Sequence, residues 1–145
     1  MLTNEQLFWA IPFASVCALL FAFIFFWKMK REGEGTETMQ KIAQHVRVGA
    51  MAYLKQQYKI VAIFFVLITL IFAWLAYGLH IQNVWVPFAF ISGGFFSGLA
   101  GYIGMKTATY ASNRVANACR NSLDAGLQIA FRSGAVLGLT VVGLA

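Results

Sequence analysis

An uncharged run from Val84 to Met105 limits what this chain can fold into more than any other feature. About 20 apolar residues, each rising ~1.5 Å along a helix, cover the ~30 Å hydrocarbon core of a bilayer. The run therefore predicts a membrane-spanning helix. After it, Lys106 to Arg120 contains neither Pro nor Gly, so we expect the same helix to continue as a polar extension beyond the membrane.

The composition extends this interpretation to the whole chain. Hydrophobic residues make up 60% of the 145 residues and charged residues only 11%, against roughly 45–50% and ~25% in soluble domains. The predicted fold is all-α, a polytopic membrane bundle with four transmembrane helices at about residues 7–27, 60–79, 84–105 and 125–145. The fourth is predicted to be truncated, because its uninterrupted apolar run covers only 133–145 where about 20 residues are needed.

The basic residues predict the orientation in the membrane. All eleven lie between Lys28 and Lys59 or between Lys106 and Arg132. The positive-inside rule places both stretches, with their helix extensions, in the cytoplasm, and the N-terminus and residues 80–83 outside. This topology also accounts for the net charge of +6, so we expect an integral protein of a prokaryotic inner membrane, with lipid and no nucleic acid as partner.

The segment before the second span predicts a helix that stands partly in water. Residues 31–38, with two glycines and three glutamates, are typical of a solvated turn, and Thr36 is a candidate N-cap. Apolar residues then follow a helical spacing from Met39 onward, and Gly49 is the single helix-weakening residue before the run 60–79. We expect one helix of about 40 residues, whose extension packs on a neighbouring helix rather than on the membrane surface.

Small residues recur every fourth position in both the third and the fourth span. Such rows let two helix backbones approach closely. The polar turn around Asn121, Ser122 and Asp124 makes the two helices antiparallel neighbours. We predict that Gly101 and Gly134, one from each row, face each other.

The chain offers few residues for chemistry, and we expect no catalytic, cofactor-binding or metal site in it. His45 and His80 fall on opposite sides of the membrane without Cys, Asp or Glu at ligand spacing. Asp124 is the single acidic residue after Glu37, too few for a carboxylate pair or a multi-carboxylate magnesium site. Cys17 and Cys119 lie at different depths, so no disulfide is expected.

Arg132 is the one charged residue set inside a predicted span. A charge in that position is a functional hypothesis by default. Arg132 lies about two turns from the start of its helix, so its long side chain can also snorkel to the surface. Two interpretations stay open: snorkelling or a structural contact, and a role in an ion path.

Three stretches together resemble the N-terminal region of the membrane-bound ion-pumping pyrophosphatases. They are Glu34–Lys59, Ser97–Arg114 (SGLAGYIGMKTATYASNR) and Ala130–Gly138 (AFRSGAVLG), and their order and spacing match as well. The resemblance covers roughly Glu34 to Ala145, whereas the first span is similar only in character. It is carried chiefly by GMKTATYASNR and AFRSGAVLG in combination.

The resemblance implies that residues 1–145 are the N-terminal outer-ring segment of a larger pump. Such a pump is a homodimer with sixteen transmembrane helices per subunit, an inner ring of six and an outer ring of ten. It is a membrane-bound inorganic diphosphatase that hydrolyses pyrophosphate with Mg²⁺ and translocates H⁺ or Na⁺. The resemblance leaves the choice of ion and the dependence on K⁺ open.

The family's magnesium-binding aspartates, catalytic lysines and ion-gate residues belong to later helices, and no position here matches those motifs. We therefore expect this chain to be scaffold that packs against the remaining helices of the parent pump, and to be inactive by itself. The alternative is a small non-enzymatic four-helix membrane protein or transporter subunit that is complete in itself. The short apolar run of the fourth span and the ordered match to the pumps both oppose this alternative.

Overall fold

Four long helices make up the computed structural model, which describes residues 4–79 and 81–144. The helices are α1 (Asn4–Lys30), α2 (Glu37–Ala73), α3 (Val86–Cys119) and α4 (Leu123–Leu144), and a π-helical turn, η1 (Trp74–Gly78), ends α2. This part of the chain contains no strand, and all four α-helices are long and apolar enough to cross a membrane. The predicted all-α membrane bundle is confirmed. His80 lies outside the described residues.

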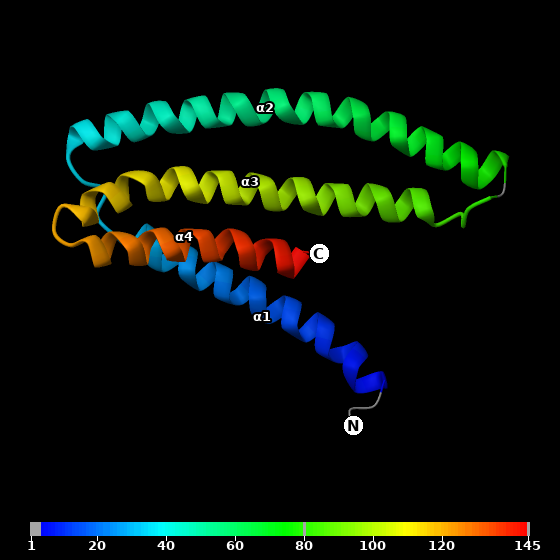
Figure 1. Cartoon of the computed structure of the whole chain (residues 1–145), viewed down its shortest axis with the longest axis horizontal. Coiled ribbons are helices and arrows are strands. Elements are labelled where there is room, and N and C mark those ends of the chain that lie inside the picture. The colour runs from blue at the N-terminus through cyan, green and yellow to red at the C-terminus, as the bar shows by residue number, and fades with distance from the viewer. Residues whose placement is uncertain (1–3, 80, 145) are drawn as a thin grey trace.

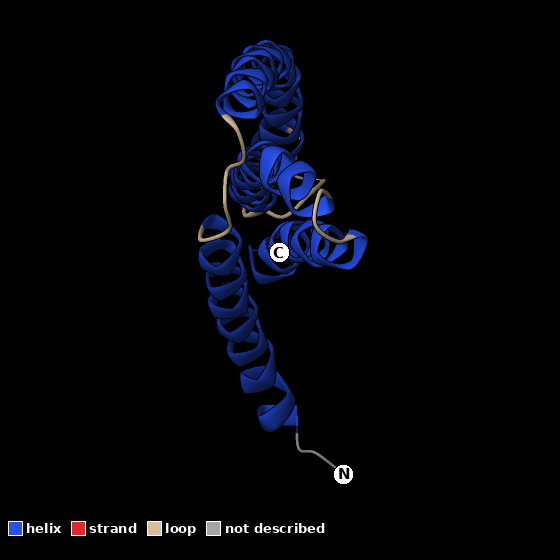
Figure 2. Cartoon of the chain, turned by 90° about the vertical axis from the view of Figure 1, so that its left-hand side faces the viewer, coloured by secondary structure: helices blue, strands red, loops and turns tan. Residues whose placement is uncertain are grey.

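Helices α2, α3 and α4 lie side by side in chain order, and α1 lies next to α4. Figure 1 shows α2 and α3 running antiparallel, with α4 on the other side of α3. Helix α1 contacts α4 from the connections as far as Gly143, which lies against Leu19 and Ser15, and diverges from the bundle toward its N-terminus (Figure 2). The connections 31–36 and 120–122 lie together at one end of the bundle. We call it the basic end, because the two connections fall within the two stretches that contain all the basic residues, 28–59 and 106–132.

The second helix is continuous, as predicted. With η1 it runs from Glu37 to Gly78 over 42 residues, since nothing in its sequence interrupts the backbone hydrogen bonds. The Thr36 hydroxyl accepts a hydrogen bond from the Met39 amide at 3.4 Å, which confirms the predicted N-cap. Ala43 is buried, and the extension packs along Ser112, Asn113 and Ala116 of α3.

The fourth helix is longer than its apolar run suggested. It forms 22 residues of continuous helix and meets the length and hydropathy of a membrane span. We predicted a truncated fourth span because the uninterrupted apolar run covers only residues 133–145 and begins after Arg132. Arg132 does not interrupt the helix, because arginine is a good helix former and its long side chain reaches Glu32 while the backbone stays helical.

The predicted contact between Gly101 and Gly134 is wrong. A Cβ atom at Gly101 would lie 2.9 Å from the hydroxyl of Tyr58 on α2, and a Cβ atom at Gly134 would have no neighbour within 4 Å. The buried residues of α4 instead follow alternating steps of three and four: Gly126, Ile129, Ser133, Val136 and Thr140. The same spacing relates buried residues of α3: Ala100, Gly104, Thr107, Ala111 and Arg114.

The spacing explains this correction. A helix has 3.6 residues per turn, so a row of every fourth residue rotates away from a straight line of contact by about 40° per step. Steps that alternate between three and four average 3.5 residues and keep facing the same neighbour. Gly104 is the glycine that approaches α4, where an added Cβ would overlap the Leu137 side chain.

Helix α3 uses its other small residues against α2. The Phe65 ring lies over Gly94 and stacks on Phe90, with ring centroids 4.3 Å apart. One turn further along α3 toward the basic end, the Gly98 carbonyl accepts a hydrogen bond from the Tyr58 hydroxyl at 2.5 Å. Because Gly94 and Gly101 have no side chain, they leave room for Phe65 and Tyr58 of α2. At these two positions α3 does not pack on the small residues of another helix.

Candidate functional site

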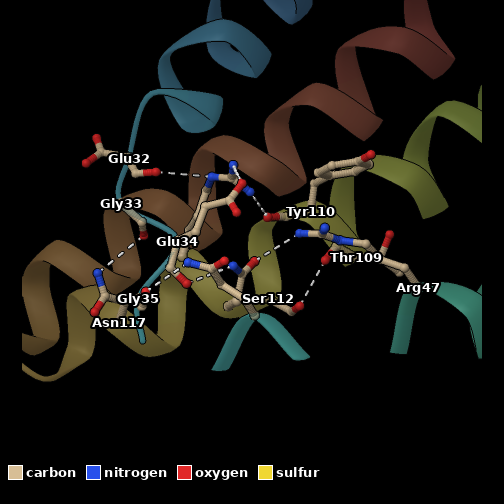
Figure 3. A network of polar contacts seen from close by, with 12 residues as sticks. Glu32, Gly33, Glu34, Gly35, Arg47, Thr109, Tyr110, Ser112 and Asn117 are labelled. Carbon is tan, nitrogen blue, oxygen red and sulfur yellow. Dashed lines mark hydrogen bonds and ion pairs between the residues drawn. The ribbon is translucent and has the colours of Figure 1, made fainter. Parts of the chain in front are cut away.

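The most extensive polar network of the molecule lies at the basic end, where α3 binds the connection between α1 and α2. The Asn113 amide donates to the Glu34 carbonyl at 2.9 Å, Arg114 Nε to the Glu32 carbonyl at 3.2 Å, and the Asn117 amide to the Gly33 carbonyl at 3.3 Å (Figure 3). Three successive backbone carbonyls are therefore held by one face of α3. We call Asn113, Arg114 and Asn117, with these carbonyls, the loop clamp.

Arg114 is the centre of the loop clamp. Its side chain is 3% exposed, and an arginine can be buried only if its charge and its donors are compensated. Arg114 Nη2 lies 2.5 Å from a carboxylate oxygen of Glu34, and Nη1 donates to the Tyr110 carbonyl at 2.6 Å. Each guanidinium nitrogen thus has a partner, two of them on the connection.

Gly35 lets the connection turn into α2. Its φ of +81° lies in the left-handed region that glycine adopts without steric cost. A Cβ atom here would also come within 2.8 Å of the Met39 sulfur and 3.2 Å of Asn117. The connection, predicted as a solvated turn, keeps exposed residues such as Gly33 and Thr36, and it is in addition hydrogen-bonded to α3 through the carbonyls of residues 32–34.

The same network includes the other two helices. On α4, Arg132 Nη1 lies 3.1 Å from a carboxylate oxygen of Glu32. On α2, the Arg47 guanidinium lies 4.2 Å from the centre of the Tyr110 ring, and its Nη2 donates to Asn113 Oδ1 at 3.3 Å. Of the two interpretations of Arg132, the structure shows a structural contact, made beside the connection at the basic end. All four helices thus meet around residues 32–34.

This arrangement joins α3 and α4 to the connection between α1 and α2. Both glutamates of the connection are engaged by arginines. Among the described residues, no group of three His, Cys, Asp or Glu could hold a metal ion. Asp124 accepts a hydrogen bond from the Gln128 amide at 3.0 Å, His45 is exposed on α2, and both cysteines are free.

Sequence reasoning missed the loop clamp, although a signal was present. Asn113, Arg114 and Asn117 interrupt a stretch of α3 that is otherwise rich in Ala, Ser and Thr. Two asparagines and an arginine on one face of a helix, with no acidic residue on that helix, indicate a polar partner elsewhere. The partner could not be named, because it consists mostly of backbone carbonyls about 80 residues away.

A comparison with protein families identifies the chain. The model described as inorganic H⁺ pyrophosphatase matches residues 16–145. The chain belongs to the inorganic H⁺ pyrophosphatase family. The resemblance inferred from residues 34–145 is confirmed, and the match extends into α1, where the sequence had shown only a general similarity to the pyrophosphatases.

Relatives within this pyrophosphatase family carry the names of ion pumps. A Bacteroides thetaiotaomicron protein, provisionally named a K(+)-stimulated pyrophosphate-energized sodium pump, is 65% identical over 97% of this chain. A Clostridium tetani protein with the same provisional name is 46% identical over 87% of it. The K(+)-insensitive pyrophosphate-energized proton pump 2 of Moorella thermoacetica is 42% identical over 96%. The chain spans about a fifth of the length of these relatives, namely 19%, 18% and 20%.

Proposed function

We propose that this chain is scaffold within an ion-translocating membrane pyrophosphatase, a homodimeric pump that hydrolyses pyrophosphate with Mg²⁺ and moves H⁺ or Na⁺ across the membrane. The observation that carries the proposal is the family match over residues 16–145. The non-enzymatic alternative of a small membrane protein has no comparable support.

The scaffold role is supported by what the described residues do. Pyrophosphate hydrolysis of this kind requires metal ions and cationic groups to neutralise the phosphates, and a carboxylate to orient water. Glu32 and Glu34 are paired with arginines, and Asp124 stands by itself on α4. The two ion pairs join α3 and α4 to the connection between α1 and α2. Hydrolysis of pyrophosphate is carried out by residues in the other four-fifths of the pump.

The proposed activity is tested on the intact pump in proteoliposomes. We expect Mg²⁺-dependent release of phosphate from pyrophosphate, together with ion accumulation in the vesicles. Na⁺ and K⁺ are tested first, because the relatives at 65% and 46% identity are named as K(+)-stimulated sodium pumps. The 145-residue chain purified by itself should release no phosphate above a mock preparation.

Two results would contradict the proposal. Lack of hydrolysis by the intact, folded protein in the presence of Mg²⁺ and K⁺ would exclude the pump. Phosphate release by the 145-residue chain by itself would show that the chemistry resides here, and the scaffold role would be wrong. Uptake of H⁺ instead of Na⁺ would change the ion and leave the scaffold role intact.

We further propose that the basic end faces the cytoplasm and the N-terminus faces outward. The one-sided distribution of Lys and Arg supports this orientation. Single cysteines at Lys41, on the first turns of α2, and at Ile81, in the connection between η1 and α3, test it in a background without Cys17 and Cys119; both positions are exposed. A membrane-impermeant maleimide added to intact cells should label Ile81→Cys and spare Lys41→Cys. The reverse pattern would invert the topology.

A further inference from the structure

An apolar groove lies between α1, α3 and α4. It holds a volume of about 370 Å³ and is lined by apolar side chains from all three helices, among them Phe23, Leu99 and Val136. All three helices are candidate membrane spans, so the groove lies at the depth of the bilayer. A groove of this kind in a membrane is filled, because its walls would otherwise lose dispersion contacts.

Lys106 is the one charged residue among the groove's lining residues. The described part of the chain forms two ion pairs, Arg114 with Glu34 and Arg132 with Glu32, and neither includes Lys106. The Lys106 ammonium lies 5.6 Å from the centre of the Tyr102 ring. Lys106 is exposed, so its ammonium is open to a negatively charged group that is not part of the described residues.

The depth of Lys106 limits what that negative charge can be. Phe26 lines the same groove and lies one residue before Trp27, after which the apolar run of α1 ends at Lys28. Lys106 is therefore within about one turn of the membrane boundary at the basic end. Lys28, Lys30 and Arg31 lie at this same end of α1 and add to the positive potential there.

We propose that the groove binds an anionic phospholipid, with an acyl chain along its apolar wall and the phosphate group at Lys106. Such a lipid matches both parts of the site, whereas a neutral lipid matches only the apolar wall. A helix from elsewhere in the pump would need a carboxylate at the level of Lys106. Basic pockets between transmembrane helices are recognised sites for anionic head groups, and the basic residues that follow Phe26 at the same end of α1 favour the lipid.

The test measures lipids retained by the intact pump. The protein is reconstituted in nanodiscs with equal amounts of dioleoyl phosphatidylglycerol and dioleoyl phosphatidylcholine, extracted, and analysed by native mass spectrometry. We expect Lys106→Gln to lower the ratio of retained phosphatidylglycerol to phosphatidylcholine about fivefold, which corresponds to ~1 kcal/mol per basic residue at an anionic surface. Lys41→Gln, an exposed lysine outside the groove, is the matched control and should leave the ratio unchanged.

A second variant tests the apolar part of the site. Leu99 lines the groove and is 37% exposed, so Leu99→Trp should fill the space and lower the retained phosphatidylglycerol, and with it the ratio to phosphatidylcholine. An unchanged ratio in Lys106→Gln would overturn the proposal. Lower thermal stability of Lys106→Gln with unaltered lipid retention would also overturn it, because that result would mean that Lys106 pairs with a carboxylate on another helix of the pump. Full lipid retention by Leu99→Trp would exclude this groove as the acyl site.

Discussion

Replacing Arg114 by alanine is expected to cost about 2–4 kcal/mol of the free energy of unfolding. The change removes the donors to the Glu32 and Tyr110 carbonyls and the partner of the Glu34 carboxylate. A fully buried ion pair that loses one member costs about 3–5 kcal/mol. Because the Glu34 side chain is 43% exposed, water can rehydrate its carboxylate, and the expected loss is smaller than for a fully buried pair.

The measurement is an unfolding titration of the intact protein in mixed detergent, followed by the fraction of folded protein. Arg120→Ala is the matched control, because Arg120 is an exposed residue at the end of the same helix and should change stability by no more than about 0.5 kcal/mol. Arg114→Lys should fall between wild type and alanine, since it keeps the charge and loses the planar fork. Equal losses from Arg114→Ala and Arg120→Ala would show that the loop clamp does not hold the connection.

Replacing Gly94 by alanine is expected to destabilise the contact between α2 and α3 by about 1–3 kcal/mol. The added Cβ atom would overlap the Phe65 ring. That ring cannot move freely, because it is stacked on Phe90, which also meets the edge of Phe72 at 5.1 Å between centroids. Moving Phe65 would therefore also sacrifice an aromatic pair, worth about 0.5–1.5 kcal/mol.

Gly98→Ala is the control for Gly94→Ala. It lies one turn further along α3, and an added Cβ atom there would have no neighbour within 4 Å, so we expect no loss of stability. A double-mutant cycle isolates the cause: in a Phe65→Ala background, Gly94→Ala should cost much less than in the wild type. Equal destabilisation by Gly94→Ala in both backgrounds would exclude overlap with Phe65 as the reason for a glycine at this position.

The sequence by itself determined that the chain forms four long helices and where α2 begins. Apolar runs of sufficient length predicted the spans, and the lack of a strong breaker between Glu37 and Ala73 predicted one long α2. The cap at Thr36 was also predictable, because its hydroxyl binds an amide only three residues away. These features depend on the local backbone and on the apolar solvent around it, both of which a single segment of sequence reports.

Only the tertiary structure decided which face of each helix meets which neighbour. Regular rows of small residues suggested Gly101 against Gly134, yet Gly101 meets Tyr58 of α2 and Gly104 meets Leu137 of α4. Four-residue repeats indicate that close approach is possible somewhere on a helix. They do not fix the rotation of that helix about its axis, which follows from how all the side chains of three helices pack together.

The loop clamp was likewise decided by the tertiary structure. Arg114 and Glu34 are 80 residues apart in the chain, and Arg132 and Glu32 are 100 apart. Charge counts showed that arginines and glutamates were present near the basic end, but each could have faced water. The pairing follows from the lateral offset between α1, α3 and α4, which sets the distance between side chains and is not encoded in the period of any one helix.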